Sequence, residues 1–441
     1  IVYAGCFYVP VNPMNPTERL RKIMEKLDPE VIISDEKGKE QLAAIGNGLE
    51  NKVMGPEALK TATGTELSEE QYSRLEQIQG QWKETDVLYG IFTSGSTGTP
   101  KAIVVSHGAA SRFIRHFTEI FVITSADVIG NQAPFDFDVS VKDIYSSIMT
   151  GAQLVLIPKE YFSTPPRLLD YLCDKKVTNL TWAVSALTLV SALKGLNYRV
   201  PESVKRVMFS GEAMPPKQLR IWQEKLPDAK FVNLYGPTEI TCNCTYFPIE
   251  RQYEDSEKIP AGKAFPGRRV ILVDEEGKQV TEPGVQGEIC SAGESLANGY
   301  YKEPEQTAEK FVLYPVDGTE QRMYRTGDLG SYDEEGNIVF AGRKDFQIKH
   351  MGHRIELEEI ERSMTALDGV EKSCCVFDTE KNRIMGFYLG EKAASDVRKQ
   401  MKEKLPVYMV PTKLIQVDEM PLNKNGKTDR NYFKNYGKNR M

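Results

Sequence analysis

The chain has 441 residues and a net charge of −6, with 27% charged and 40% hydrophobic residues. This composition is typical of a soluble globular protein of about three domains; the acidic charge argues against nucleic acid and the lack of a long apolar run against a membrane span. Seven cysteines without metal-ligand spacing indicate free thiols in a reducing compartment, so we expect a cytoplasmic location.

Strands and amphipathic helices alternate over the first 260 residues. Apolar runs at 31–34, 153–157 and 207–210 predict strands, and a helical spacing of apolar residues marks 17–26 and 216–225. Such alternation predicts parallel sheets covered by helices, which is an α/β fold.

The pattern changes after Ala261. The segments 269–277 and 331–340 predict strands that meet at turns made of acidic residues and glycine. We therefore expect a small, more antiparallel, β-rich subdomain at about 261–344.

A third region begins near Asp345. The pattern predicts helices at 354–364 and 393–404, with a hairpin between them from 373–377 and 384–389. The predicted architecture is a large N-terminal domain of stacked α/β sheets at 1–344, with its β-rich subdomain, followed by a small α+β domain at 345–441.

The segment Phe92–Lys101 is rich in glycine and hydroxyl side chains and follows an apolar strand. Free backbone N–H groups, hydroxyls and the final lysine favour binding of a phosphate chain. The spacing differs from that of a Walker loop, because Pro100 stands where the second glycine would be. A solvated Ser/Thr linker is the alternative.

Three further motifs carry groups that a nucleotide or an amine would need. Asp138 lies between apolar neighbours and suits a cationic amine, although a helix N-cap is the alternative. The segment 233–239 combines an aromatic ring, a hydroxyl and a carboxylate, which suit a purine, a phosphate and Mg²⁺. Asp328 offers an acceptor for the two ribose hydroxyls. Taken singly, such glycine–acid pairs are typical of turns.

The order of these motifs resembles the adenylate-forming superfamily, in particular the adenylation domains of non-ribosomal peptide synthetases. The resemblance extends over nearly the entire chain, through 3–11, 287–289, 299–300, 342–349, 352–361, 405–411 and 425–430. It implies a two-step reaction. A carboxylate attacks the α-phosphorus of MgATP to give acyl-AMP and pyrophosphate, and the acyl group then moves to the phosphopantetheine thiol of a carrier protein.

The resemblance also implies which residues hold the nucleotide. Lys427 is the implied catalytic residue, because a cation beside the attacking carboxylate stabilises the redistributing charge; an exposed tail lysine is the alternative. Glu239 is the implied Mg²⁺ ligand. The implied nucleotide-binding residues are Thr93, Ser94, Gly95, Ser96, Thr97, Gly98, Lys101, Gly211, Glu212, Asn233, Tyr235, Gly236, Thr238, Asp328 and Arg343.

Asp138 falls where amino-acid-activating members of the family carry the carboxylate that pairs with the substrate ammonium. This favours an amino acid over a fatty or aryl acid. A buried lysine needs an anionic partner, so Lys142 favours an acidic or hydrogen-bonding substrate side chain; the alternative is that Lys142 extends into solvent beside Asp143. The implied substrate-binding residues are Asp138, Val139, Lys142, Trp182, Met208, Ser210, Leu234, Cys242 and Asn243.

Family members rotate the C-terminal domain between the two half-reactions, which implies a mobile lid with its hinge at Asp345. The chain opens inside an early strand motif of the family, so we expect it to be truncated at the N-terminus. No carrier signature follows Arg430, so the thiol acceptor is expected on another domain or protein. A D-alanine–carrier protein ligase, an acyl-CoA ligase and a non-catalytic nucleotide-binding relative are the alternatives.

Overall fold

The computed structural model describes residues 1–95, 100–379, 381–422 and 428–436. Its contacts divide the chain into two compact units. The first unit comprises Ile1–Pro10, Trp82–Ile91 and Ala102–Asp345, and the second comprises Val11–Gln81, Phe92–Lys101 and Phe346–Met441. Within the described residues, every helix is too short or too polar to cross a bilayer.

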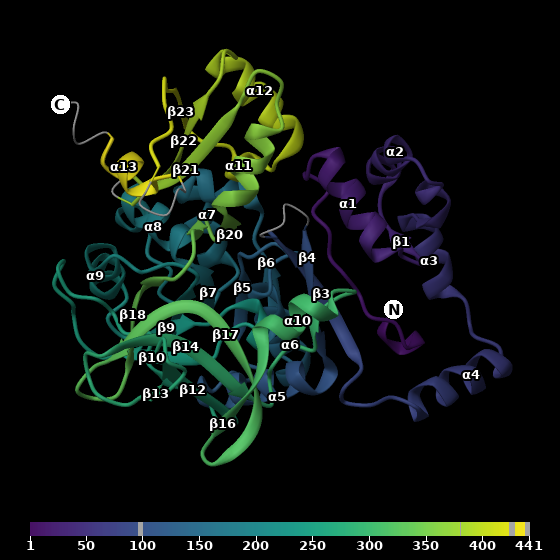
Figure 1. The fold of residues 1–441 in the computed structure, drawn as a ribbon. Coiled ribbons are helices and arrows are strands. Elements are labelled where there is room, and N and C mark those ends of the chain that lie inside the picture. The colour runs from purple at the N-terminus through teal and green to yellow at the C-terminus, as the bar shows by residue number, and fades with distance from the viewer. Residues whose placement is uncertain (96–99, 380, 423–427, 437–441) are drawn as a thin grey trace. The chain divides into compact units, whose positions relative to one another are not determined.

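A seven-stranded sheet forms the centre of the first unit (Figure 1), in the order β11-β10-β9-β8-β7-β5-β6. Strands β5 to β9 pair in parallel, and β10 and β11 are antiparallel additions at one edge. The predicted alternation of strands and helices is therefore confirmed here. The strands are β5 (Val128–Asn131), β6 (Gln153–Leu156), β7 (Asn179–Ala183), β8 (Arg206–Ser210), β9 (Lys230–Tyr235), β10 (Thr245–Ile249) and β11 (Lys263–Ala264).

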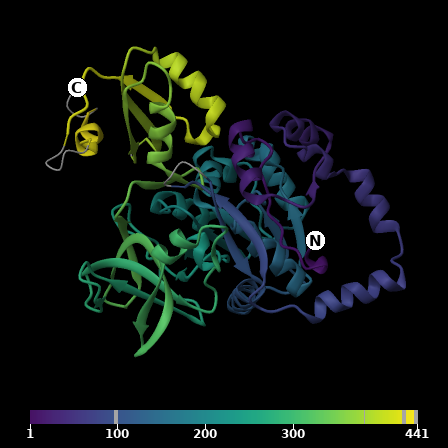
Figure 2. The same cartoon turned by 45° about the vertical axis from the view of Figure 1, so that its right-hand side comes forward.

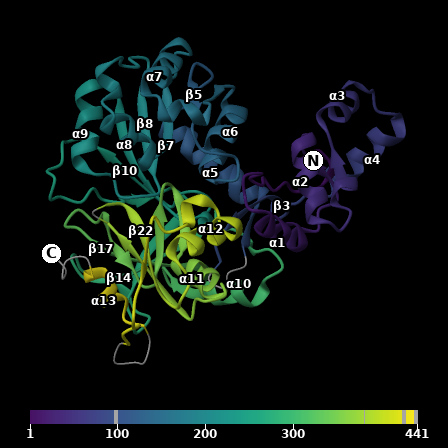
Figure 3. The ribbon, with the colours of Figure 1, turned by 90° about the horizontal axis from the view of Figure 1, so that it is seen from above.

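Helices cover both faces of this sheet (Figure 3). Helices α5 and α6 lie against one face with Met208 and Leu234 of the strands. Helices α7, α8 and α9 lie against the other face, over a second core that contains Trp182 and Phe209. The helices are α5 (His107–Ile120), α6 (Val139–Thr150), α7 (Pro165–Asp174), α8 (Val184–Ala192) and α9 (Pro216–Lys225).

An antiparallel sheet of six strands forms the β-rich part of the first unit. Two of its hairpins turn at 274–278 and 333–337, the acidic-glycine turns that the sequence predicts. A further sheet has the order β15-β4-β3. The elements are β3 (Val87–Thr93), β4 (Lys101–Ser106), β12 (Arg268–Val273), β13 (Gln279–Val280), β14 (Gln286–Gly293), β15 (Gly299–Tyr300), α10 (Pro304–Lys310), β16 (Phe311–Val316), β17 (Thr319–Tyr332) and β18 (Ile338–Arg343).

The C-terminal part of the second unit is a three-stranded sheet, β21-β22-β23, with α11 and α12 beside it (Figure 2). Its hairpin confirms the sequence prediction. The predicted helix from Arg354 starts only at Leu357, because 353–356 pair with β19 as a strand. The elements are β19 (Gln347–His350), β20 (His353–Glu356), α11 (Leu357–Thr365), β21 (Lys372–Asp378), β22 (Arg383–Leu389), α12 (Ala394–Lys404), β23 (Lys413–Gln416) and α13 (Arg430–Asn435).

The early part of the second unit consists of short helices and one small parallel sheet. The strand predicted at 31–34 is only two residues long, and the helix predicted from Thr17 is present. The elements are α1 (Thr17–Leu27), β1 (Ile32–Ile33), α2 (Glu36–Ile45), β2 (Val53–Met54), α3 (Pro56–Gly64) and α4 (Glu69–Gly80).

Candidate active site

One loop, which leaves the end of β9 and returns into β10, carries most of the predicted chemistry. A Cβ atom at Gly236 would lie 2.6 Å from the Cα atom of Asn243, so only glycine allows the start and end of the loop to approach so closely. Thr241 and Cys242 take left-handed φ angles of 56° and 67°. The loop therefore folds back on itself, and its first and last residues lie side by side.

The start of the loop is joined to the β-rich sheet through a carboxylate. The hydroxyl of Tyr235 donates a hydrogen bond of 2.6 Å to Oδ2 of Asp328, and Nη1 of Arg343 pairs with Oδ1 of the same carboxylate. Asp328 and Arg343 face each other in the β17–β18 register. Burial and the nearby Asp328 raise the pKa of Tyr235, so its hydroxyl stays a proton donor. Three predicted nucleotide-binding residues thus form one buried network.

Arg343 also contacts the predicted hinge residue. Its Nε atom lies 2.6 Å from Oδ1 of Asp345, and its Nη2 atom lies 2.7 Å from Oδ2. This bidentate pair has the planar geometry in which arginine binds carboxylates most strongly. Asp345 is therefore linked through a single guanidinium to Asp328, while its role as a hinge stays a prediction.

Glu239, the predicted metal ligand, has no exposed surface, and its Oε1 atom accepts a hydrogen bond of 2.9 Å from the hydroxyl of Tyr300. Among the described residues, no three His, Cys, Asp or Glu side chains gather as a metal-binding group. A Mg²⁺ ion that arrives with a nucleotide needs only one or two protein carboxylates, because phosphates and water supply its other ligands. A single, oriented carboxylate such as Glu239 fits that requirement.

The remaining nucleotide-site predictions in the first unit lie at the ends of β8 and β9. Gly211 has a φ of 98° and open space where a Cβ atom would be, and Glu212 beside it is half-buried. The side chain of Asn233 donates a hydrogen bond of 2.8 Å to the carbonyl of Pro260. Thr238 begins a short 3₁₀ turn directly before Glu239. These residues come from consecutive strand ends of one sheet, where α/β proteins bind ligands.

The predicted phosphate loop belongs to the second unit. The Oγ1 atom of Thr93 is buried and has no hydrogen-bond partner among the described residues. The hydroxyl of Ser94 donates a hydrogen bond of 2.7 Å to the carbonyl of Arg354. Gly95 and Lys101 are buried. The predicted residues Ser96, Thr97, Gly98 and Lys427 lie outside the described residues.

Asp138 occupies the N-cap position of α6, but its side chain makes no capping hydrogen bond there. Asp138 therefore has the N-cap position that the alternative predicts, but its side chain does not make the hydrogen bond of a cap. The Sγ atom of Cys242 donates to the backbone carbonyl of Asp138 over 3.1 Å. Asp138 and Val139 are half-buried, so the start of α6 reaches solvent beside the end of the loop.

Lys142 lies one helical turn after Asp138 and is completely buried, with 0% exposed surface. The alternative in which its ammonium extends into solvent is wrong. Its Nζ atom donates a hydrogen bond of 2.7 Å to Oδ1 of Asn243, the last predicted residue of the loop. Burial lowers the pKa of Lys142. Its neighbour Asp143 accepts a hydrogen bond of 3.0 Å from the side-chain amide of Asn131, and burial raises the pKa of the Asp143 carboxyl to about 7.

The structure separates Trp182 from the other predicted substrate-site residues. Met208 pairs with Thr181 in the register and Phe209 pairs with Trp182, so Met208 and Trp182 point to opposite faces of the sheet. Trp182 packs in the second core, and its indole N–H donates a hydrogen bond of 2.8 Å to the carbonyl of Gly130. Met208 and Leu234 lie on the face of the sheet that α6 covers. Ser210 is two residues after Met208 in β8, so its side chain points to the same face.

Sequence reasoning missed four tyrosines. Tyr300 holds Glu239, as described above. The hydroxyls of Tyr8 and Tyr145 lie 3.0 Å apart, and Tyr89, with 0% exposed surface, has a hydroxyl without a hydrogen-bond partner in the described structure. Tyr8, Tyr89 and Tyr300 lie in segments with strand-like patterns. A tyrosine that only packs in an apolar core would occur in the same patterns, so tertiary contacts alone distinguish a site tyrosine from a core tyrosine.

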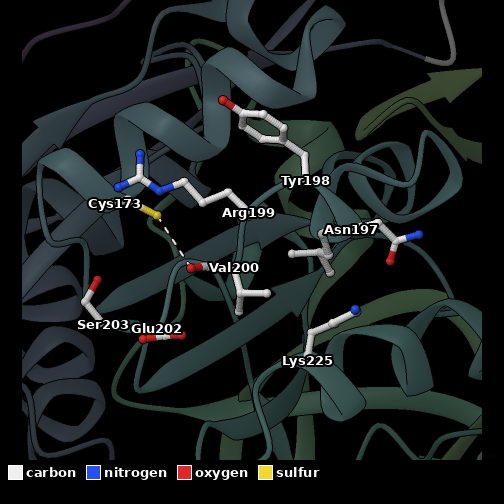
Figure 4. Close-up of a pocket in the computed structure, with 9 residues that line it drawn as sticks. Cys173, Asn197, Tyr198, Arg199, Val200, Glu202, Ser203 and Lys225 are labelled. Atoms are coloured by element: carbon white, nitrogen blue, oxygen red, sulfur yellow. Dashed lines mark hydrogen bonds between the residues drawn. The ribbon is translucent and has the colours of Figure 1, made fainter.

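A surface cavity of about 490 Å³ lies elsewhere in the first unit, beside α7 and α9 (Figure 4). Its lining includes Cys173, whose thiol donates 3.6 Å to the carbonyl of Val200, and Arg199, whose guanidinium pairs with Asp170. None of the predicted site residues lines it.

Comparison with known families gives a match over most of the chain. The AMP-binding enzyme family model matches residues 1–301, and the AMP-binding enzyme C-terminal domain model matches residues 359–427. Tyrocidine synthase 3 of Brevibacillus parabrevis is 33% identical over 98% of this chain, which spans only 6% of that protein. The D-alanine--D-alanyl carrier protein ligase of Bacillus velezensis (strain DSM 23117 / BGSC 10A6 / LMG 26770 / FZB42) is 33% identical over 97% of this chain and 84% of its own length.

Solved structures have the same fold. The Vibrio cholerae adenylation domain AlmE, in complex with glycyl-adenosine-5'-phosphate, has a TM-score of 0.83 at 23% identity, with 100% of this chain and 85% of that chain covered. At this identity the likeness shows the fold alone. The structure of IdnL1 has a TM-score of 0.75 at 28% identity and covers 94% of this chain and 83% of its own.

Proposed function

Because the chain belongs to the AMP-binding enzyme family, we propose that it activates an amino acid with MgATP and transfers it to a carrier protein. The acceptor is the phosphopantetheine thiol of that carrier. The chain spans only 6% of the length of tyrocidine synthase 3, so the activity of any larger protein is part of the proposal.

The observation that carries the proposal is the loop from Tyr235 to Asn243. At its start, Tyr235 contacts Asp328, which would hold a ribose. At its end, Cys242 contacts Asp138 and Asn243 contacts Lys142. The candidate nucleotide side and the candidate amino acid side are thus joined by one folded loop, as a reaction between the two substrates requires.

In the first step, an oxygen of the amino acid carboxylate forms a bond to the α-phosphorus of ATP. The bond from that phosphorus to the bridging oxygen breaks, and pyrophosphate leaves with the electron pair. This chemistry requires positioning and charge stabilisation more than a protein nucleophile. Lys427 supplies the cation for the two approaching anions, and Thr93–Lys101 binds the outer phosphates through hydroxyls and backbone N–H groups.

The described residues supply the rest of the nucleotide site. Asp328 accepts from the ribose hydroxyls, with Arg343 holding its second oxygen, and Tyr235 provides the aromatic surface for adenine. Thr238 contacts the α-phosphate. Glu239 would hold Mg²⁺, which supplies charge neutralisation to the phosphates when bound, and Tyr300 orients that carboxylate.

In the second step, the thiolate of the carrier attacks the acyl carbon. A carbon–sulfur bond forms, the bond to the phosphate oxygen breaks, and AMP leaves. The C-terminal domain, residues 345–441, rotates between the two steps about Asp345, so Lys427 serves only the first. The free thiols of all seven cysteines support a cytoplasmic location as part of this proposal.

A D-alanine–carrier protein ligase is the second candidate. The observation in its favour is the match to the Bacillus velezensis ligase, which extends over 97% of this chain and 84% of the ligase. Both candidates share the chemistry above and differ in the amino acid and the carrier. The substrate panel of the exchange assay distinguishes them.

Amino-acid-dependent exchange of pyrophosphate into ATP tests the proposal. The full chain is assayed with each proteinogenic amino acid, D-alanine and β-alanine. We expect exchange with one substrate class, and a loss of about 100- to 1000-fold in Lys427→Ala. Lys434→Ala removes an exposed lysine of α13 and is the matched control, expected to exchange like the wild type.

Exchange with D-alanine alone would establish the second candidate. An absence of exchange with every amino acid, from protein that is folded by circular dichroism, would overturn the proposed function. Unchanged exchange in Lys427→Ala would remove the catalytic role of that residue.

A further inference from the structure

Lys142 is a buried cation whose partners do not balance its charge. Its ammonium has three N–H donors, and the described structure provides one acceptor, the neutral amide oxygen of Asn243 at 2.7 Å. No carboxylate among the described residues lies within 4.0 Å of it. An unpaired buried charge is costly, whereas an uncharged side chain of similar size would fill the same space without that cost.

Asp143, although adjacent in sequence, does not supply the missing charge. Its carboxylate accepts from Asn131, and burial raises its pKa to about 7, so near neutral pH it is only partly ionised. The other charged group that acts on Lys142 is Asp138, one turn earlier on the same helix. In the proposed reaction Asp138 binds the substrate ammonium.

Lys142 belongs to a group of polar side chains near the start of α6, in which Lys142 contacts Asn243, Cys242 contacts Asp138, and Tyr8 contacts Tyr145. We define the α6 polar cluster as Tyr8, Tyr89, Asp138, Lys142, Tyr145, Cys242 and Asn243. The Tyr89 hydroxyl is fully buried and unpartnered within the described residues, and it lies in the electrostatic environment of Cys242 and Asp138. The cluster therefore holds both a hydroxyl without a hydrogen-bond partner and a cation whose charge is not balanced. Tyr8, Asp138 and Tyr145 are half-buried, so the cluster reaches solvent.

The spacing of the two charges on α6 matches a small dipolar ligand. Residues at i and i+4 on a helix lie on the same face, with Cβ atoms about 5–6 Å apart. Asp138 and Lys142 have this spacing. A ligand that carries an ammonium and, a few bonds away, an anion would complement both.

We propose that the amino acid activated by this protein has an anionic side chain, of the aspartate or glutamate class. This rests on the proposed function. Asp138 binds the α-ammonium, and Lys142 binds the side-chain carboxylate with Asn243 beside it. Lys142 is then the residue that distinguishes the acid from its amide.

The test is pyrophosphate exchange by the wild-type full chain with all proteinogenic amino acids, D-alanine, β-alanine, D-aspartate and D-glutamate. We expect kcat/KM for one acid to exceed that for its amide by about 100-fold or more, since an amide would leave the buried cation unbalanced. A preference for a neutral or basic amino acid overturns this inference and leaves the proposed function standing. Silence with every amino acid overturns the proposed function, and the inference with it.

Two variants locate the effect at Lys142. Lys142→Met keeps the length of the side chain and removes its charge, and we expect the ratio of acid to amide exchange to fall by about 100-fold. Asn243→Asp gives Lys142 a competing carboxylate and should lower the same ratio without removing the lysine. Lys217→Met changes an exposed helical lysine of the same unit and is the control. A ratio that stays unchanged in both variants, each shown to be folded by its thermal transition, overturns the role of Lys142.

Discussion

Both faces of the seven-stranded sheet are buried, but they differ in how their polar groups are hydrogen-bonded. On the α7–α9 face, Trp182, Phe209 and Trp222 form an apolar core in which the indole N–H groups donate to backbone carbonyls. On the α6 face, the charged residues Lys142 and Asp143 are both buried. On the first face both indole N–H groups have an acceptor, whereas on the second face an ammonium has one neutral acceptor.

This difference separates stability from recognition within a single sheet. A buried apolar face whose indole N–H groups are hydrogen-bonded contributes free energy of folding. A buried polar face with unbalanced charge costs free energy, and such sites are concentrated where ligands bind. Changes on the α7–α9 face should therefore alter stability alone, while changes on the α6 face should alter stability together with substrate preference or pH dependence.

The largest expected effect comes from Trp182→Ala. It removes a fully buried indole and leaves the carbonyl of Gly130 without its donor, so we expect the free energy of unfolding to fall by about 3–5 kcal/mol. Urea denaturation measures this. Substrate preference in the exchange assay should not change, and a changed preference would contradict the placement of Trp182 on the far face.

Asp143→Asn should change the pH dependence of stability. The pKa of Asp143 is raised from 3.8 to about 7, so the unfolded state loses this proton at lower pH than the folded state. Its contribution to stability is therefore present below about pH 4 and is lost as the pH rises to about 7, by up to about 4 kcal/mol. The variant should lose less stability over this window than the wild type. Asp228→Asn, at an exposed position, should follow the wild type.

Asn243→Leu removes the acceptor of the Lys142 ammonium. We expect a loss of about 2–3 kcal/mol in urea denaturation, because a buried cation is left without its hydrogen bond. The double variant with Lys142→Met should recover much of this loss, and a double-mutant cycle measures the coupling. Additive losses would show that the two side chains do not interact.

Tyr145→Phe has the smallest expected effect. It removes the hydrogen bond between the hydroxyls of Tyr8 and Tyr145, both half-buried, so we expect a loss of about 1 kcal/mol in urea denaturation. Tyr8→Phe should cost a similar amount, and the double variant should cost less than the sum of the two. Two fully independent losses would contradict the contact.

The sequence predicted the architecture where patterns are local. The alternation of strands and helices, the two acidic-glycine turns of the β-rich sheet and the hairpin β21–β22 all follow from periodicity and turn chemistry within a few residues. The helix expected from Arg354 was displaced by three residues, because pairing of β20 with β19 is a contact that helical periodicity does not report.

The sequence predicted which residue types form the candidate site, but not which face of the seven-stranded sheet each side chain points to. The order of motifs placed Tyr235, Asp328 and Arg343 together by family resemblance, and the structure joins them in one network. Motif order also grouped Trp182 with Met208. A shift of one residue along a strand reverses the face of a side chain, so this grouping depended on a register that motif spacing does not determine.

By itself, the sequence determined the chemistry available to this protein: a glycine- and hydroxyl-rich loop, a carboxylate at the start of a helix, and a lysine four residues later. The tertiary structure decided whether that lysine is solvated. Its ammonium is buried because α6 packs against the sheet at the point where the loop from β9 returns, with Asn243 as its acceptor. Burial depends on what surrounds a side chain from distant parts of the chain, and local sequence does not contain that information.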